Sequence, residues 1–344
     1  MLRIKIPQID RHRNETTFRP YLNSADIFRE VGIDFVFEGN KYDMAWIGQA
    51  SYMDKTLSLI DSVNKGIEYL EQFKGQDYIL FDGQDSATLK GSVEVFNESE
   101  AKYLLKNTLY SDLGNYRRFS TTGRIYWPAI SPYDLYCVPF GQDFSKIKLS
   151  GTNWLSGIPF NQFSYSHATK DIDVFAMFQY PGKLNYEWGI ETSKYYTDHR
   201  KNCIDQLKQL PAHIKVVTAE QGKIPLQEYY ELMSRSKIVV APFGYGEIAP
   251  RDAESAQVGA ILIKPDMDHI QTVPNVYADP QNFMNVEWDY SDLGSIIDGL
   301  LTDYKLQQQY YVENFRRSYC IEYTTEKMVA HIYELIRSIE GYTI

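Results

Sequence analysis

One short stretch of the chain combines two glycines with closely spaced charges, a pattern suited to binding an anionic ligand. Its loop runs through Gly244, Tyr245, Gly246 and Glu247. Glycines allow a sharp bend and a close approach of a ligand to the backbone. Pro250 then suits the first turn of a helix, where free N–H groups and the helix dipole favour an anion. We therefore expect this loop to hold a diphosphate.

Two charged residues of the expected helix extend that site. Arg251 and Glu254 are three positions apart, so their side chains are neighbours on one helix face. Arg251 could bind the diphosphate and Glu254 could accept hydrogen bonds from ribose hydroxyls, although a surface ion pair would show the same spacing. After the next apolar run, Lys264 could pair with phosphate and Asp266 could bind hydroxyls of a sugar. An ordinary Pro-Asp turn also explains this second pair.

A second group of polar residues is expected where two earlier strands end. His12 lies in a charged stretch, residues 10–14, that we expect to form a loop after the first strand, while Asp82 and Asp85 follow another apolar run. Ligands of open α/β sheets bind beyond the carboxyl ends of the strands. Each of these three residues is therefore a candidate general base for an acceptor hydroxyl, and a nearby carboxylate could tune the pKa of His12. A surface histidine among arginines is the alternative for His12.

Alternating strands and helices are predicted around these residues. Apolar runs of four to six residues are typical of strands buried on both faces, and longer segments show a helical period. Strands are expected at residues 2–6, 34–37, 42–47, 78–81, 173–178, 214–218, 238–241, 260–263 and 273–277, with further runs at 101–109 and 125–138. Helices are expected at residues 23–31, 56–73, 197–210, 225–236, 250–259, 289–305 and 307–339.

The length of 344 residues suits two domains. Residues 140–170 show no clear period, so we expect a linker or long loop there. The sequence then divides into an α/β unit at residues 1–150, a second α/β unit at 151–323 and a terminal helical segment at 324–344.

Composition excludes several classes of protein. With 44% hydrophobic and 23% charged residues the chain is globular, and its net charge of −10 argues against a broad nucleic-acid surface. Cys137, Cys203 and Cys320 are far apart, which fits neither a disulfide framework nor a zinc site and indicates a reducing compartment. No signal peptide or long apolar span is visible, so we expect a cytoplasmic protein without a membrane span. The best metal-like motif, at residues 171–173, precedes a strand instead of ending one, and no metal is expected.

The stretch from residue 237 to 267 resembles the donor-binding segment of glycosyltransferases with the GT-B fold. It is most similar to exostosin-like members, in which Arg-x-x-Glu is followed by a glycine and an apolar strand. Here these positions are Arg251, Glu254, Gly259 and residues 260–263. The resemblance implies an α/β protein with two Rossmann-like domains facing a cleft, and a C-terminal helix that crosses back to the first domain. It also implies that Arg251 faces the diphosphate and Glu254 the ribose.

The same resemblance implies a reaction. Such an enzyme moves a hexose or pentose from a nucleotide-diphosphate sugar, of the UDP or GDP type, to a hydroxyl of a glycan or glycoconjugate. The donor would bind the second domain and the acceptor the first, without a metal or other cofactor. Retaining members often pair two glutamates eight positions apart, but Gly246 stands eight before Glu254 and Glu247 is one position off. We therefore expect inversion.

Two other functions remain open. Gly244-x-Gly246-x-x-Ala249 also matches a dinucleotide fingerprint, with Asp266 about twenty residues on, as in an NAD-dependent oxidoreductase. That fingerprint normally follows the first strand of its domain, whereas here at least two strands precede it. A non-catalytic protein that binds a nucleotide or a sugar is the second alternative.

Overall fold

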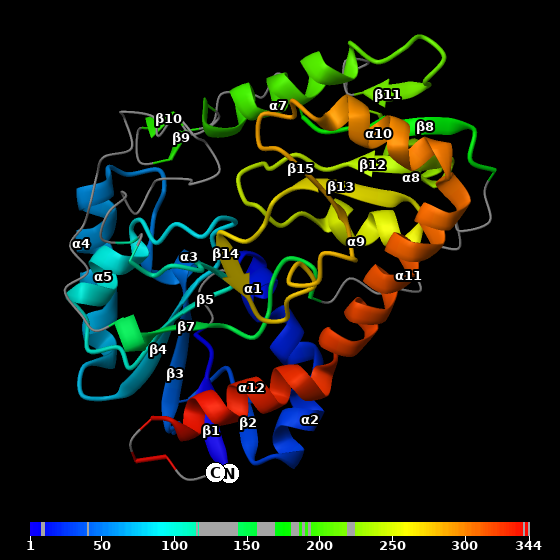
Figure 1. Cartoon of the computed structure of the whole chain (residues 1–344). Coiled ribbons are helices and arrows are strands. Elements are labelled where there is room, and N and C mark those ends of the chain that lie inside the picture. The colour runs from blue at the N-terminus through cyan, green and yellow to red at the C-terminus, as the bar shows by residue number, and fades with distance from the viewer. Residues whose placement is uncertain are drawn as a thin grey trace.

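Two separate parallel sheets form the framework of the protein (Figure 1). The structure is a computed structural model. It describes residues 1–7, 11–39, 41–114, 116, 144–156, 169–179, 186–187, 190–191, 194–218, 224–339 and 341–342.

The first sheet has six strands in the order β2-β1-β3-β4-β5-β7, and each neighbouring pair is parallel. Its central strand β3 is buried along its whole length, which explains the short apolar run that predicted it. The strands are β1 Leu2–Lys5, β2 Ile33–Val36, β3 Met44–Gly48, β4 Asp77–Asp82, β5 Leu104–Lys106 and β7 Ile147–Leu149. The helices of this half are α1 Arg11–Asn23, α2 Ala25–Glu30, α3 Gln49–Tyr52, α4 Leu59–Leu70 and α5 Ser92–Asn97, with short 3-10 turns η1 Glu71–Phe73 and η3 Phe144–Lys146.

The second sheet has five parallel strands in the order β11-β8-β12-β13-β15. The strands are β8 Ile172–Ala176, β11 Val216–Thr218, β12 Ser236–Val240, β13 Ile261–Pro265 and β15 Met284–Val286. The helices are α7 Lys194–Leu207, α8 Leu226–Ser234, α9 Pro250–Gln257, α10 Leu293–Thr302 and α11 Tyr304–Glu322, and β9 Tyr186–Glu187 pairs with β10 Ile190–Glu191. The candidate loop therefore lies between the middle strand β12 and helix α9.

A small antiparallel pair joins the two halves. Strand β6, Thr108–Tyr110, follows β5 of the first sheet. It pairs with β14, Ile270–Thr272, which follows β13 of the second sheet. One hydrophobic core also spans the boundary, because Leu80 and Leu104 belong to the same buried cluster as Phe243 and Ala253. The two sheets are thus held together by both backbone and apolar contacts.

The last helix returns to the first sheet, as the resemblance implied. Helix α12, Thr325–Arg337, begins where the Thr324 side chain accepts a hydrogen bond from the Lys327 backbone N–H, as an N-cap does. Its apolar face, including Ile332, packs in one core with Ile4 and Trp46 of the first sheet. Figure 1 shows this helix, in red, crossing the lower part of the first half beside α2. The predicted GT-B arrangement of sheets and terminal helix is confirmed.

Three local predictions differ from the structure. Residues 10–14 were expected to form a loop, but α1 already begins at Arg11. The strand expected at 273–277 is wrong, because β14 ends at Thr272 and turns follow. The expected linker at 140–170 contains β7, an edge strand whose three residues are too few to show a period. The run at 125–138 lies outside the described residues, and the domain boundaries stay predictions.

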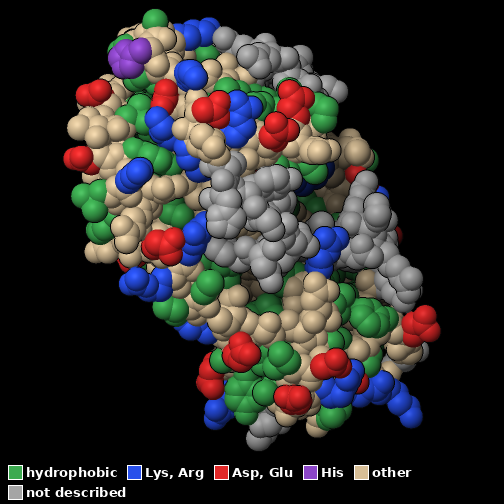
Figure 2. Space-filling model, turned by 90° about the vertical axis from the view of Figure 1, so that its right-hand side faces the viewer, with side chains coloured by type: hydrophobic (Ala, Val, Ile, Leu, Met, Phe, Trp, Pro, Cys, Tyr) green, Lys and Arg blue, Asp and Glu red, His purple; other side chains and the backbone are tan. Residues whose placement is uncertain are grey.

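The surface carries both signs of charge. On the face shown in Figure 2, acidic and basic side chains are interspersed over both halves. Within the described residues, no helix has the length and apolarity that crossing a membrane requires. The same residues contain no cluster of three or more histidine, cysteine, aspartate or glutamate side chains that could hold a metal ion.

Candidate active site

The two loops singled out by the sequence meet between the sheets. The Gly244 backbone N–H donates to the Gly246 carbonyl at 3.0 Å, which closes a tight turn after β12. Gly246 lies so close to the loop after β4 that a Cβ atom there would overlap the carbonyl oxygen of Asp85. Only glycine allows this approach of two backbones. The loop at 244–247 therefore faces the loop that contains Asp82 and Asp85.

Arg251 and Glu254 lie on α9 and each bonds a tyrosine of α8. The Arg251 Nε donates to the Tyr229 hydroxyl at 3.2 Å, and the Tyr230 hydroxyl donates to Glu254 Oε1 at 2.7 Å. Both charged side chains are half-buried, and burial raises the pKa of the Glu254 carboxyl. Arg251 and Glu254 are neighbours on one helix turn, as predicted. The hydroxyl groups of two tyrosines, instead of an ion pair, hold their side chains in place.

The side chain of Lys264 is fully buried, whereas a lysine that contacts a phosphate must be open to the ligand. Its Nζ forms an ion pair with Asp252 at 3.0 Å, and both side chains are fully buried. Asp252 also accepts hydrogen bonds from the Tyr277 hydroxyl at 2.7 Å and from the Ala249 backbone N–H at 3.2 Å. Burial lowers the pKa of Lys264, and the neighbouring Asp252 opposes that change. Lys264 therefore supports the start of α9 from beneath.

Two further donor-side candidates have local or buried partners. The Asp266 Oδ1 accepts a hydrogen bond from the Asp268 backbone N–H at 2.6 Å, which is the ordinary turn that its sequence also suggested. Glu247 is fully buried. Burial lowers the pKa of both Lys106 and Lys264, and the charge of Glu247 opposes that change in each, so this carboxylate lies near one buried lysine of each half. Tyr245, between the two glycines, is half-buried.

On the first half, Asp82 is also buried in an ion pair. Its Oδ1 lies 3.1 Å from the Nζ of Lys106, and it accepts a hydrogen bond from the Gln84 backbone N–H at 2.8 Å. The same lysine donates to the Gln84 carbonyl at 3.1 Å, so the pair fixes the shape of the loop after β4. Asp85 is half-buried. His12 lies in the first turn of α1, and its side chain is outside the described part of the chain.

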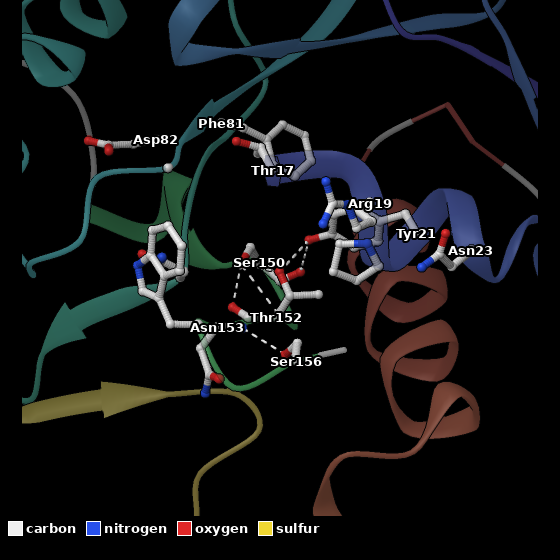
Figure 3. A pocket seen from close by; sticks show the side chains of 14 residues that line it. Thr17, Arg19, Tyr21, Asn23, Phe81, Asp82, Ser150, Thr152, Asn153 and Ser156 are labelled. Atoms are coloured by element: carbon white, nitrogen blue, oxygen red, sulfur yellow. Dashed lines mark hydrogen bonds between the residues drawn. The ribbon is translucent and has the colours of Figure 1, made fainter. Parts of the chain in front are cut away.

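A cavity of about 250 Å³ opens beside this loop, at the carboxyl ends of β4, β5 and β7. It is rich in hydroxyl and amide groups, and Figure 3 shows Tyr21, Ser150 and Thr152 turned toward one another. The Tyr21 hydroxyl donates to the Ser150 carbonyl at 2.6 Å, and burial raises the pKa of Tyr21 to about 12. The carboxylate of Asp82 points away from this group in the same view. The lining includes Thr17, Arg19, Tyr21, Asn23, Asn107, Thr152 and Trp154.

Comparison with known proteins places this geometry in a known fold. No protein-family model and no curated protein matches the sequence. Among solved structures, WaaG, a glycosyltransferase involved in lipopolysaccharide biosynthesis, matches with a TM-score of 0.53 at 10% identity, over 98% of this chain and 100% of that chain. An alpha-glucosyltransferase in complex with UDP and a 13-mer DNA containing a central A:G mismatch matches with a TM-score of 0.51 at 11% identity, with the same coverage. The chain has the GT-B fold.

Within the GT-B fold, the glycine loop does not stand where a dinucleotide fingerprint would. It follows β12, after β8 and β11 of the same sheet, whereas the fingerprint opens the first strand-to-helix turn of its domain. Sequence reasoning missed three residues that shape this GT-B site, namely Lys106, His199 and Asp252. Asp252 alone carried a local signal, since an acidic residue in the first turn of a helix can accept a bond from the N-cap backbone N–H.

Proposed function

We propose that the protein is a glycosyltransferase that moves a sugar from a nucleotide-diphosphate donor to a hydroxyl of a glycan or glycoconjugate. One observation carries this proposal. A glycine loop that leads into a helix N-terminus with Arg251 lies directly against the loop of Asp82 and Asp85 on the other sheet. A donor held at the first loop would present its sugar to a group held at the second. Transfer between two bound substrates needs such an arrangement.

The donor-side roles follow from charge and position. The positive end of the α9 helix dipole and the Arg251 guanidinium would bind the diphosphate, and the Glu254 carboxylate would accept hydrogen bonds from the ribose. The UDP or GDP type of donor, the hexose or pentose, and the exostosin-like subtype rest on the sequence pattern at residues 237–267. Free thiols at Cys203 and Cys320 fit the proposed cytoplasmic location.

The cavity at the carboxyl ends of β4, β5 and β7 is the proposed acceptor site. Its hydroxyl and amide groups match the hydroxyls of a sugar, and Trp154, 36% exposed, offers an aromatic face to the apolar side of the ring. Arg19 also lines the cavity and would receive an anionic group of a glycoconjugate. These features favour a carbohydrate over an apolar acceptor.

We propose inversion, with a base drawn from His12, Asp82 and Asp85. Asp82 is fully buried in its ion pair with Lys106, whereas Asp85 keeps part of its surface exposed and adjoins Gly246. This contrast favours Asp85 over Asp82. Turnover of Asp85→Asn and His12→Ala, measured with fixed donor and acceptor, decides between the remaining two.

A ligand panel tests the proposed function directly. Thermal shift with UDP, GDP, dTDP, CMP and NAD should show stabilisation by a nucleoside diphosphate and none by NAD. Stabilisation by NAD alone would instead favour the oxidoreductase. Release of the nucleotide from a nucleotide sugar, measured with candidate glycan acceptors, then separates an enzyme from a non-catalytic binding protein.

Arg251→Ala should weaken binding of the nucleoside diphosphate by about 1.5–3 kcal/mol, because a charged hydrogen bond is lost. Isothermal titration measures the change. Arg235→Ala is the matched control, since Arg235 precedes β12 at the opposite edge of the sheet and pairs with Asp171 at the surface. Equal affinity of the Arg251→Ala protein and the wild type would refute the phosphate role.

Trp154→Ala should raise KM for the acceptor about fivefold, because loss of an aromatic face costs about 1 kcal/mol. The Kd of the nucleoside diphosphate should stay the same, since the donor binds the other half. Phe37→Ala, another exposed aromatic residue, serves as the control. An unchanged acceptor KM in the Trp154→Ala enzyme would remove this cavity as the acceptor site.

A further inference from the structure

Two residues of helix α7 form hydrogen bonds with both backbone polar groups of Phe243, the residue at the start of the glycine loop. The Phe243 backbone N–H donates to the Nε2 of His199 at 3.2 Å, and the Phe243 carbonyl accepts from the Nε of Arg200 at 3.0 Å. The imidazole also stacks on the Phe243 ring, with ring centres 5.3 Å apart and planes 12° from parallel. Two consecutive helix residues thus hold the two peptide groups that flank the Cα atom of Phe243.

Arg200 extends the same contact to a second loop and to Gly244. Its Nη1 donates to the carbonyl of Gln179, in the segment after β8, at 2.9 Å. Its Nη2 lies 2.5 Å from the place that a Cβ on Gly244 would occupy, so the guanidinium rests against that glycine. One planar side chain therefore connects the carboxyl ends of two neighbouring strands, β8 and β12, at the edge where the donor is proposed to bind.

His199 is itself held by a strained residue. The Tyr290 hydroxyl lies 2.7 Å from His199 Nε2, and both side chains are fully buried. Tyr290 has a φ of 63°, a left-handed conformation that is unfavourable for a bulky side chain. Strain of this kind persists where the surrounding structure requires it, and it gathers near functional sites. Because the Phe243 N–H can only donate, Nε2 must be the acceptor and the ring must be neutral.

We propose that His199 and Arg200 are positioning residues that set the donor loop, residues 243–247, in its binding conformation before the nucleotide arrives. This inference rests on the proposed function, because it assigns a role within the donor site. A loop already held in the bound conformation loses less entropy on binding. Both residues act on the loop through the backbone groups of Phe243.

Three variants separate this role from general structural support. His199→Leu removes the hydrogen-bond acceptor, whereas His199→Gln places an oxygen acceptor as many bonds from the backbone as the Nε2 of histidine. Arg200→Met keeps a long side chain that forms no hydrogen bonds to the two carbonyls. His213→Gln, on the exposed surface beyond α7, is the control. Each variant is measured in two ways: hydrogen–deuterium exchange of residues 243–247 in the unliganded protein, and the Kd of the nucleoside diphosphate that stabilises the wild type most.

In His199→Leu and Arg200→Met, the amides of residues 243–247 should exchange at least about tenfold faster than in the wild type. The Kd of the nucleoside diphosphate should rise about tenfold, while the exchange rates of the β12 amides should stay unchanged. His199→Gln should restore most of both properties. If loop exchange stays at the wild-type rate in both deletion variants, or if His199→Gln behaves as His199→Leu does, the positioning role is wrong. Arg200 is only half-buried, so its variant remains informative if His199→Leu fails to fold. A wild type that binds no nucleoside diphosphate overturns the proposed function, while the exchange measurement still decides the positioning role.

Discussion

Replacing Gly246 with alanine is expected to lower kcat/KM for sugar transfer about 10²-fold, the size of effect that follows a misplacement of about 1 Å. The new Cβ would overlap the backbone carbonyl of Asp85, and a backbone atom cannot swing aside as a flexible side chain can. The donor loop and the loop after β4 must therefore move apart. Steady-state kinetics with a fixed acceptor measure the loss.

Gly299→Ala is the control for that experiment. Gly299 lies inside α10, and a Cβ there meets no atom within 4 Å. Alanine also favours a helix more than glycine does, so this variant should keep full activity and an equal or higher melting temperature. Wild-type kcat/KM in the Gly246→Ala enzyme would show that catalysis does not depend on the contact between the two loops.

The titration of His199 is expected to remove about 4–5 kcal/mol from the free energy of unfolding between pH 6.5 and pH 3, at 1.36 kcal/mol for each pKa unit. Burial lowers the pKa of His199 from 6.5 to about 3, and the positive charges of Arg200 and Lys264 act in the same direction. Below pH 6.5 the unfolded chain binds a proton on this ring, whereas the folded chain does so only near pH 3. Stability present above pH 6.5 is therefore lost as the pH falls.

Urea unfolding at a series of pH values measures this loss. In His199→Gln the side chain at position 199 no longer titrates, so the decline between pH 6.5 and pH 3 should become shallower. His213→Gln changes a histidine on the exposed surface and should keep the slope of the wild type. Identical slopes for His199→Gln and the wild type would mean that His199 does not govern acid unfolding.

Local pattern was sufficient to predict the elements that carry the candidate donor loop. The strand, glycine loop, helix and strand from residue 236 to 265 are continuous in the chain, and each element shows its own signal. The spacing of Arg251 and Glu254 on one turn likewise depends only on helix geometry. Strand β7 was missed because three residues are too few for a period. Helix α1 was not predicted, because charged residues outnumber apolar ones in its first turns.

Sequence pattern did not predict contacts between residues that are far apart in the chain. Asp82 meets Lys106 only because β4 and β5 are neighbours in the sheet, and Lys264 meets Asp252 only because α9 packs beside β13. Each pair places opposite charges in the core, which single-residue patterns cannot indicate. His199 was equally hidden, since one of its partners is a backbone group, which has no sequence signature, and the other, Tyr290, lies far away in the chain.

The core that spans both sheets has a consequence for how the chain unfolds. Leu80 and Leu104 pack in one cluster with Phe243 and Ala253, and the β6–β14 pair crosses the same boundary. Either half alone would leave that apolar surface in water and lose part of its driving force for folding. Although the architecture has two sheets, we therefore expect the chain to unfold as one cooperative unit, in which a destabilising change in one half also lowers the stability of the other.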